Sequence, residues 1–131
     1  MAAQRRAQKK DLRIYEAVYH FNLYRYLSRF FANKEARVWP EFPAGNGAID
    51  LIIEYKGTRY GLELKSYTDE SDHSKSLKQA AQYGKFLQLP VIHLVVFVEY
   101  IPDEYRKKYE NDYTDEETGV IVRPVFAATG E

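Results

Sequence analysis

The chain has 131 residues, the length of one ordinary domain, and it is too short to hold two independent hydrophobic cores. Hydrophobic residues make up 45% of it and charged residues 29%, a composition typical of a folded domain rather than a disordered one. Cysteine is absent, which excludes disulfides, thiolate catalysis and zinc–thiolate sites. The sequence shows neither an apolar run of membrane-spanning length nor a signal peptide, so we expect a cytoplasmic protein with no membrane partner.

The net charge is zero, but its sign changes along the chain. Residues 1–40 carry nine lysines and arginines against three acids, whereas residues 99–131 carry four against nine. A basic cluster opens the first segment, at Arg5, Arg6, Lys9, Lys10 and Arg13. Such a cluster can neutralise nucleic-acid phosphates, and it can equally be the solvated start of a helix. Charge alone therefore neither requires nor excludes a nucleic-acid partner.

The first predicted element is a long helix over residues 11–32, in which apolar residues recur at steps of three and four. A second apolar strip indicates that this helix is covered on more than one side. Asn33 is suited to end it in a left-handed conformation. Residues 36–42 favour an extended segment whose prolines are typical of a sheet edge, and the glycines of residues 45–47 predict a turn.

A β-hairpin is the clearest local prediction, because the strand-like runs 49–55 and 58–65 are separated only by Lys56-Gly57. After it the pattern predicts a polar loop, a helix capped by Ser74 and a buried strand, at residues 67–73, 74–88 and 91–98. A strand, a crossover helix and a buried strand favour parallel pairing.

The C-terminal third of the chain shows a weaker pattern. It favours a short helix, an acidic loop and a last strand, at residues 102–110, 111–118 and 119–127. The whole order of elements predicts an α/β domain with a mixed central sheet flanked by helices.

Asp50, Glu63 and Lys65 form the candidate site of the hairpin. With a turn at Lys56-Gly57, the numbers of facing residues add up to about 113, which places Asp50 opposite Glu63. Lys65 lies two residues beyond Glu63 and therefore points to the same face. Two carboxylates without a nearby thiolate suit a hard cation, above all Mg²⁺, with Mn²⁺ as a substitute. A lysine beside them can orient water and stabilise negative charge in a transition state.

This combination is sufficient for hydrolysing a phosphodiester bond, but a structural alternative exists. The same three residues can form an exposed cross-strand charge set that serves only the surface of the sheet.

The surrounding sequence resembles the PD-(D/E)XK nuclease superfamily, whose signature is an aspartate followed by a Glu/Asp-x-Lys triplet on the neighbouring strand. Here the aspartate is Asp50 and the triplet is Glu63-Leu64-Lys65, while Ile49 stands in place of the proline. The long first helix, and the helix and buried strand after the triplet, follow the order of this superfamily, so the resemblance covers residues 11–98.

That resemblance implies a restriction-endonuclease-like αβββαβ core and a Mg²⁺-dependent endo- or exodeoxyribonuclease. Asp50 and Glu63 would bind the metal with help from the backbone carbonyl of Leu64, and Lys65 would position water. Glu16 stands on the first helix, where many members carry a glutamate that joins the metal shell.

A second motif points to one branch of the superfamily. Gln79 and Tyr83 are one helical turn apart and share a helix face. They resemble the Gln-x-x-x-Tyr element of the RecB-like branch, which implies that both side chains line a nucleic-acid groove.

The hairpin is also similar to nuclease domains appended to certain predicted bacterial AAA-type ATPases, through matches at Gly47, Asp50, Gly57, Tyr60, Glu63 and Lys65. This similarity implies an ATPase or helicase partner, although the sequence has no phosphate-binding loop of its own.

We therefore predict a single PD-(D/E)XK nuclease-like domain over residues 1–131, with a basic start at 1–10, a core at 11–98 and a C-terminal helical turn and strand at 99–131. The expected partner is DNA, with RNA left open, and the first helix could supply a homodimer interface. The alternative is a catalytically inactive module of the same fold that binds nucleic acid or protein.

Overall fold

The computed structural model describes the chain from Lys9 to Gly130, with side chains from Glu16 onward. The predicted basic cluster, Arg5, Arg6, Lys9, Lys10 and Arg13, lies outside these described side chains. The elements are α2 (Lys9–Phe30), β1 (Ala36–Ala44), β2 (Gly47–Tyr55), β3 (Thr58–Ser66), α3 (Glu70–Phe86), β4 (Val91–Val98), α4 (Asp103–Tyr109), β5 (Tyr113–Thr114) and β6 (Ile121–Ala128).

The strands form one six-stranded mixed sheet in the order β1-β2-β3-β4-β6-β5. β1, β2 and β3 pair antiparallel, β3, β4 and β6 pair parallel, and β5 joins β6 antiparallel. The α/β class, the mixed sheet and the parallel pairing across the crossover helix are thus confirmed. β5 is an addition, formed within the segment that the sequence predicts as an acidic loop.

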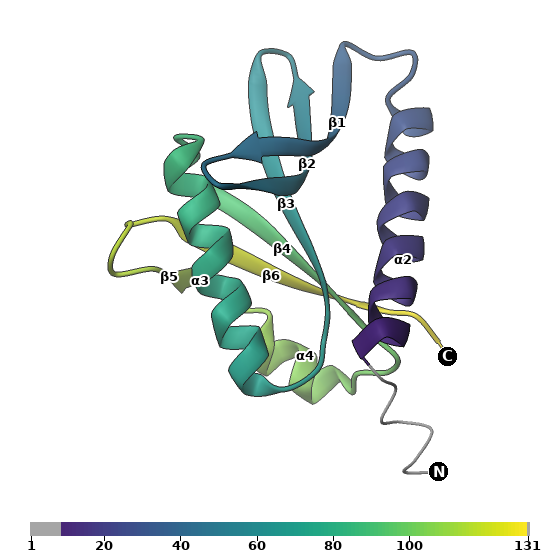
Figure 1. Ribbon diagram of the computed structural model, residues 1–131, viewed down its shortest axis with the longest axis vertical. Coiled ribbons are helices and arrows are strands. Elements are labelled where there is room, and N and C mark those ends of the chain that lie inside the picture. The colour runs from purple at the N-terminus through teal and green to yellow at the C-terminus, as the bar shows by residue number, and fades with distance from the viewer. Residues whose placement is uncertain (1–8, 131) are drawn as a thin grey trace.

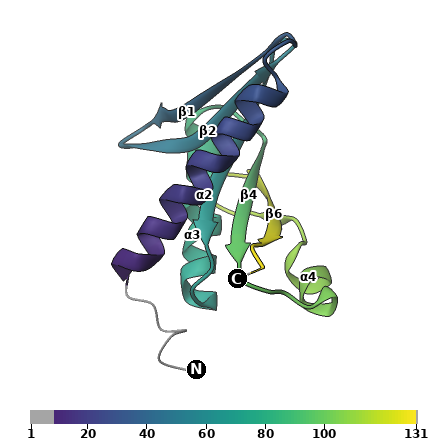
Figure 2. The same ribbon diagram turned by 90° about the vertical axis from the view of Figure 1, so that its right-hand side faces the viewer.

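The two long helices lie on opposite sides of the sheet (Figures 1 and 2). α3 packs on β4 and β6 with a face of small buried residues that includes Ala80, Ala81 and Gly84. Small side chains let the helix approach the strands closely, and the alternate residues Ile92, Leu94 and Val96 of β4 fill the layer beneath it. α2 covers β1 and β3 on the other side.

Two predicted helix boundaries are wrong. α3 begins at Glu70, because the carboxylate of Asp69 accepts a hydrogen bond from the N–H of Asp72 at 2.7 Å, and Ser74 lies inside the helix. α2 ends at Phe30, and Asn33 does not adopt a left-handed conformation. The chain instead leaves the helix through tight turns, in which Lys34 N–H donates to the carbonyl of Phe31.

The β2–β3 hairpin has the predicted turn. Lys56 and Gly57 have φ angles of 49° and 81°, the left-handed pair that matches the twist of a two-residue hairpin. At the other end of β2, pairing with β1 is interrupted at Glu41, which has a φ of 48° and lies opposite Asp50. This irregularity places Asp50 at a break in the β1–β2 ladder.

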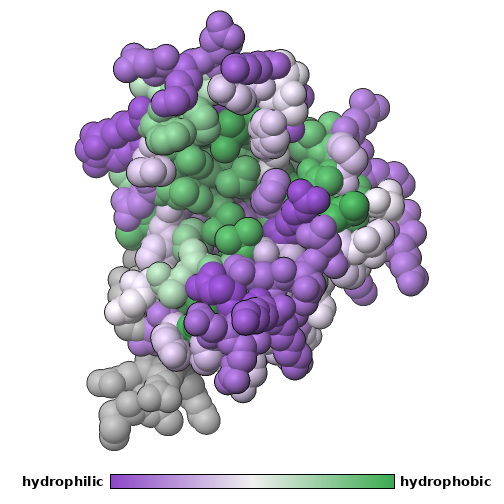
Figure 3. All heavy atoms as spheres, turned by 180° about the vertical axis from the view of Figure 1, so that it is seen from behind, coloured by the Kyte–Doolittle hydropathy of each residue, from purple (hydrophilic) through white to green (hydrophobic). Residues whose placement is uncertain are grey.

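Some large apolar side chains are exposed on the surface. On the side seen in Figure 3, apolar side chains gather in the upper half and hydrophilic ones cover the lower half. On α2 the residues Val18, Phe21, Tyr26 and Phe30 are 48–62% exposed, so the predicted covering of this helix on more than one side is not present within the domain. A homodimer through this helix stays a prediction. None of the described helices is long and apolar enough to cross a lipid bilayer.

Close packing at Gly84 gives a test of this arrangement. A Cβ at this position would lie 2.8 Å from Val120 Cγ1 and 3.2 Å from the carbonyl oxygen of Leu89. We expect Gly84→Ala to lower the free energy of unfolding by about 1–2 kcal/mol, since the clash outweighs the gain in helix propensity. Urea denaturation measures the change, and Gln82→Ala, at an exposed position of the same helix, is the control. An increase in stability would contradict this packing.

Candidate active site

Asp50 lies where β2 separates from β3. The β2–β3 ladder ends at the pair Leu51 and Leu62, and Asp50 is tied to β3 through carboxylates instead. Its Oδ2 accepts a hydrogen bond from the N–H of Leu64 at 2.7 Å, and its own N–H donates to Glu63 Oε1 at 3.3 Å. The expected proximity of Asp50 and Glu63 is therefore present in the structure.

Glu63 is a buried acid, with only 3% of its surface exposed. Burial, the hydrogen bond to Asp50 and the negative charge of Asp50 together raise the pKa of Glu63 to about 9, while the charge of Lys65 acts in the opposite direction. Without a cation at the site, Glu63 therefore carries a proton at neutral pH. This burial does not fit the alternative of an exposed charge set.

Lys65 is half-buried two residues further along β3. It lies near enough to Glu63 to lower the pKa of that carboxyl, yet within the described part of the chain no carboxylate lies within 4.0 Å of its ammonium group. Leu64, between them, has its side chain in the core. Because the N–H and C=O of a strand residue point to the same side, the Leu64 carbonyl faces the Asp50 side of β3.

α2 contributes two further polar side chains to the site. Glu16 Oε2 accepts a hydrogen bond from the N–H of Ser66 at 3.1 Å. His20 lies between two acids, with Nε2 3.7 Å from Glu16 Oε1 and Nδ1 3.7 Å from Asp50 Oδ1. Its Nε2 is buried and has no hydrogen-bond partner among the described residues.

His20 is the residue that sequence reasoning gives no role. The available signal was its spacing, four residues after Glu16, which places both side chains on one helix face. Nothing in the sequence shows that this face turns toward Asp50.

α3 brings its motif to the other side of the site. Gln79 Nε2 donates to the hydroxyl of Tyr83 at 3.1 Å, so the two side chains act as a pair. Burial raises the pKa of Tyr83, and the negative charges of Glu63 and Asp50 add to this shift, so its hydroxyl lies within the field of the two acids. A Cβ on Gly47 would lie 3.0 Å from that hydroxyl, so glycine leaves room for the tyrosine over the start of β2.

The donors suit a hard cation but do not form a complete cage. In the part of the chain with described side chains, no group of three or more His, Cys, Asp and Glu residues is arranged to hold a metal ion. What the site offers is two adjacent carboxylates and one carbonyl oxygen. Mg²⁺ is usually bound by one or two protein carboxylates and keeps several waters or substrate oxygens, so this partial oxygen set fits it.

Comparison with known proteins does not add to this geometry. The chain matches no protein-family model, and no curated protein or solved structure is significantly similar to it.

The raised pKa of Glu63 predicts how stability depends on pH. Between about pH 4.5 and 9, Glu63 is protonated in the folded chain and ionised in the unfolded chain. The free energy of unfolding therefore falls as pH rises through this range. Glu63→Gln keeps the shape without the ionisation. We expect it to stabilise the metal-free protein at pH 8 by at least about 1 kcal/mol, the equivalent of a single pKa unit, and to flatten the pH profile.

Urea denaturation at several pH values in EDTA measures both effects. Glu54→Gln, at a less buried position of β2, is the matched control and should leave the pH profile unchanged. A Glu63→Gln protein with the same slope as the wild type would contradict a buried, protonated Glu63.

Proposed function

We propose that the chain is a Mg²⁺-dependent nuclease of the PD-(D/E)XK type with a restriction-endonuclease-like αβββαβ core. The observation that carries this proposal is the pair Asp50 and Glu63, joined by a hydrogen bond at the end of the β2–β3 ladder. Lys65 follows on the same strand and has no ion-pair partner among the described residues. The order of α2, β1, β2, β3, α3 and β4 is that of the proposed core.

Energetics favour a role in chemistry over a role in the fold. A buried carboxyl next to a second carboxylate costs stability, and a purely structural site would offset that cost with a salt bridge. Glu63 instead holds a proton because its pKa is raised to about 9, and Lys65 has no ion-pair partner among the described residues. A divalent cation can replace the proton and relieve the repulsion.

Each residue then has a separate task. The carboxylates of Asp50 and Glu63 would hold the ion with the Leu64 carbonyl, and Glu16 would join them through water. A bound Mg²⁺ would lower the pKa of a coordinated water and screen the phosphate oxygens. Lys65 would orient the attacking water and stabilise charge on the phosphate, and His20 lies between Asp50 and Glu16, with a ring nitrogen 3.7 Å from a carboxylate oxygen of each.

The proposed substrate is a nucleic acid, with DNA preferred. Gln79 and Tyr83 stand on the α3 side of the acids, where their polar ends can contact a phosphodiester backbone that approaches Lys65. An ATPase or helicase partner, and a homodimer through the outer side of α2, belong to the same proposal.

Cleavage assays test the reaction. We expect the wild type to cut at least one of supercoiled, linear, single-stranded or branched DNA, or single-stranded RNA, in Mg²⁺ or Mn²⁺. Asp50→Asn keeps an acceptor for the Leu64 N–H but removes the charge, and it should lower the rate by at least about a hundredfold, as should Lys65→Ala. Lys107→Ala, an exposed lysine on α4, should cut normally. Binding without cleavage of any substrate would favour an inactive nuclease-fold module instead.

Metal binding is tested separately by thermal melts. Mg²⁺ should raise the Tm of the wild type and not of Asp50→Asn, because an ion that binds only the folded state stabilises it. Since Glu63 must lose a proton to bind the ion, the rise should be larger at pH 8 than at pH 6. For a chain of this size each kcal/mol corresponds to about 3–5 °C. An equal rise in both proteins would place the ion elsewhere.

A further inference from the structure

A cavity lies away from the acids, between α4 and the ends of β3, β4 and β6. It has a volume of about 550 Å³, and its walls include Tyr67, Glu99, Tyr100, Tyr105, Tyr109 and Phe126. The loop between β4 and α4 forms one side, and α4 forms another. Four tyrosines and a phenylalanine around one cavity are an unusual concentration for a surface site.

Several of these rings face solvent. Tyr100 is 77% exposed and Tyr105 is 48% exposed, whereas Phe126 is buried and supports the floor. Tyr67 and Tyr109 pack on Phe126, with ring centroids 6.3 and 6.0 Å apart. The cavity is therefore open on the side of Tyr100 and Tyr105, whereas its inner rings, Tyr67 and Tyr109, are also in contact with the ring of His73.

The charged side chain in the described wall of the cavity is negative, although α4 also carries Arg106, Lys107 and Lys108. Glu99 lies in its wall, and the Tyr109 hydroxyl donates to Glu70 Oε1 at 2.6 Å. The negative charges of Glu70 and Asp69 contribute to the raised pKa of Tyr67, so their field reaches the rings. No lysine or arginine is part of the described wall.

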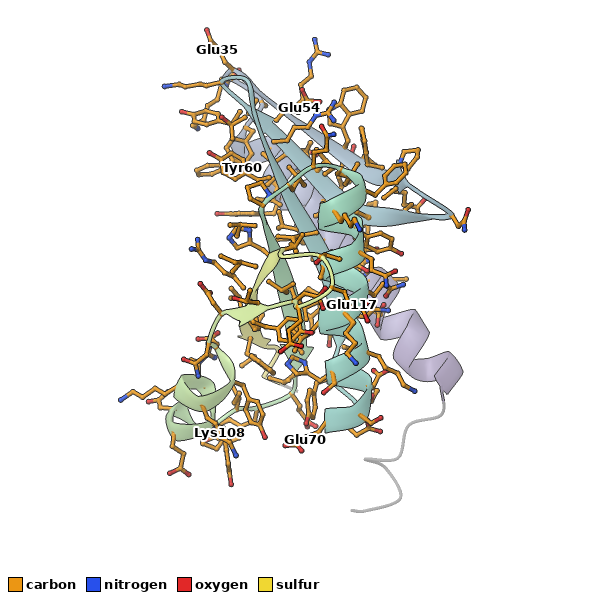
Figure 4. All side chains as sticks on the ribbon, turned by 90° about the vertical axis from the view of Figure 1, so that its left-hand side faces the viewer. Glu35, Glu54, Tyr60, Glu70, Lys108 and Glu117 are labelled. Carbon is orange, nitrogen blue, oxygen red and sulfur yellow. The ribbon has the colours of Figure 1, made fainter. Side chains whose placement is uncertain are left out.

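One cation already contacts an aromatic ring at this end of the molecule. Lys108 Nζ lies 5.4 Å from the ring centroid of Tyr109. Figure 4 shows Glu70 and Lys108 at the same end of the molecule, with Tyr60 toward the opposite end.

We propose that this cavity binds an arginine side chain presented by a partner protein. A guanidinium group stacks on aromatic rings and is weakly hydrated, so it gains most from a pocket of tyrosines beside carboxylates. The same carboxylates repel a phosphodiester backbone. The cavity is also too open for a free small molecule, which usually has most of its surface buried, but it suits a side chain held by its own protein. The volume leaves space for the residues that flank the arginine.

A peptide titration tests this proposal on the full chain. The probe is a peptide with blocked ends that carries two arginines between glycines and serines, and the control peptide has citrulline in their place. NMR amide shifts should appear at residues 98–109 with a Kd of about 1 mM or tighter. Tyr105→Leu, which keeps an apolar side chain without the ring, should raise the Kd about three- to fivefold. Glu99→Gln should do the same, and Tyr60→Leu should have no effect.

Salt dependence and two control ligands distinguish between the possible occupants of the cavity. Binding of the arginine peptide should weaken as NaCl rises from about 50 to about 500 mM. Equal binding of the citrulline peptide would show an apolar pocket and overturn the proposal, as would no shift up to about 10 mM peptide. Shifts at residues 98–109 with a single-stranded oligonucleotide and none with the peptide would show a nucleic-acid groove instead. Cleavage activity is not needed for these readouts, so the result is independent of the proposed nuclease function.

Discussion

The close approach of two acids, Asp50 and Glu63, is the constraint on which the site depends. Two carboxylates at hydrogen-bond distance in a partly buried place cannot both be charged unless a cation lies with them. The fold maintains this arrangement by using the first acid as a hydrogen-bond acceptor for the backbone of β3 and by burying the second beneath α3. In the metal-free chain a proton on Glu63 removes one of the two negative charges. A proton and a cation therefore compete for the same small site.

The elements that the sequence predicts correctly are those fixed by local chemistry. A two-residue turn with left-handed φ angles determines the register of the hairpin, and that register alone brings Asp50 and Glu63 together. Continuous apolar character predicts β4 correctly as a strand, but only its alternate residues are fully buried and the others are half-buried. The alternation of Glu63, Leu64 and Lys65 follows from the period of a strand.

What the sequence could not provide depends on tertiary packing. The break in the β1–β2 ladder at Glu41 and the burial of Glu63 appear only in the assembled sheet. The position of His20 depends on the rotation of α2, and because that helix carries apolar residues on more than one side, its sequence does not show which side faces the strands. The start of α3 was missed since Asp69 and Ser74 are both good caps, and only tertiary contacts choose between them.

The separation of β2 from β3 at Asp50 affects how firmly the two strands are held together. Beyond this residue the segment that leads back to β1 is joined to β3 by the carboxylates of Asp50 and Glu63, not by backbone ladder bonds. The strength of these hydrogen bonds therefore depends on the ionisation state of the two carboxylates rather than on backbone pairing. Side-chain carboxylates thus hold the start of β2 to β3 within the antiparallel part of the sheet, and a change in their charge would change how firmly this edge is held.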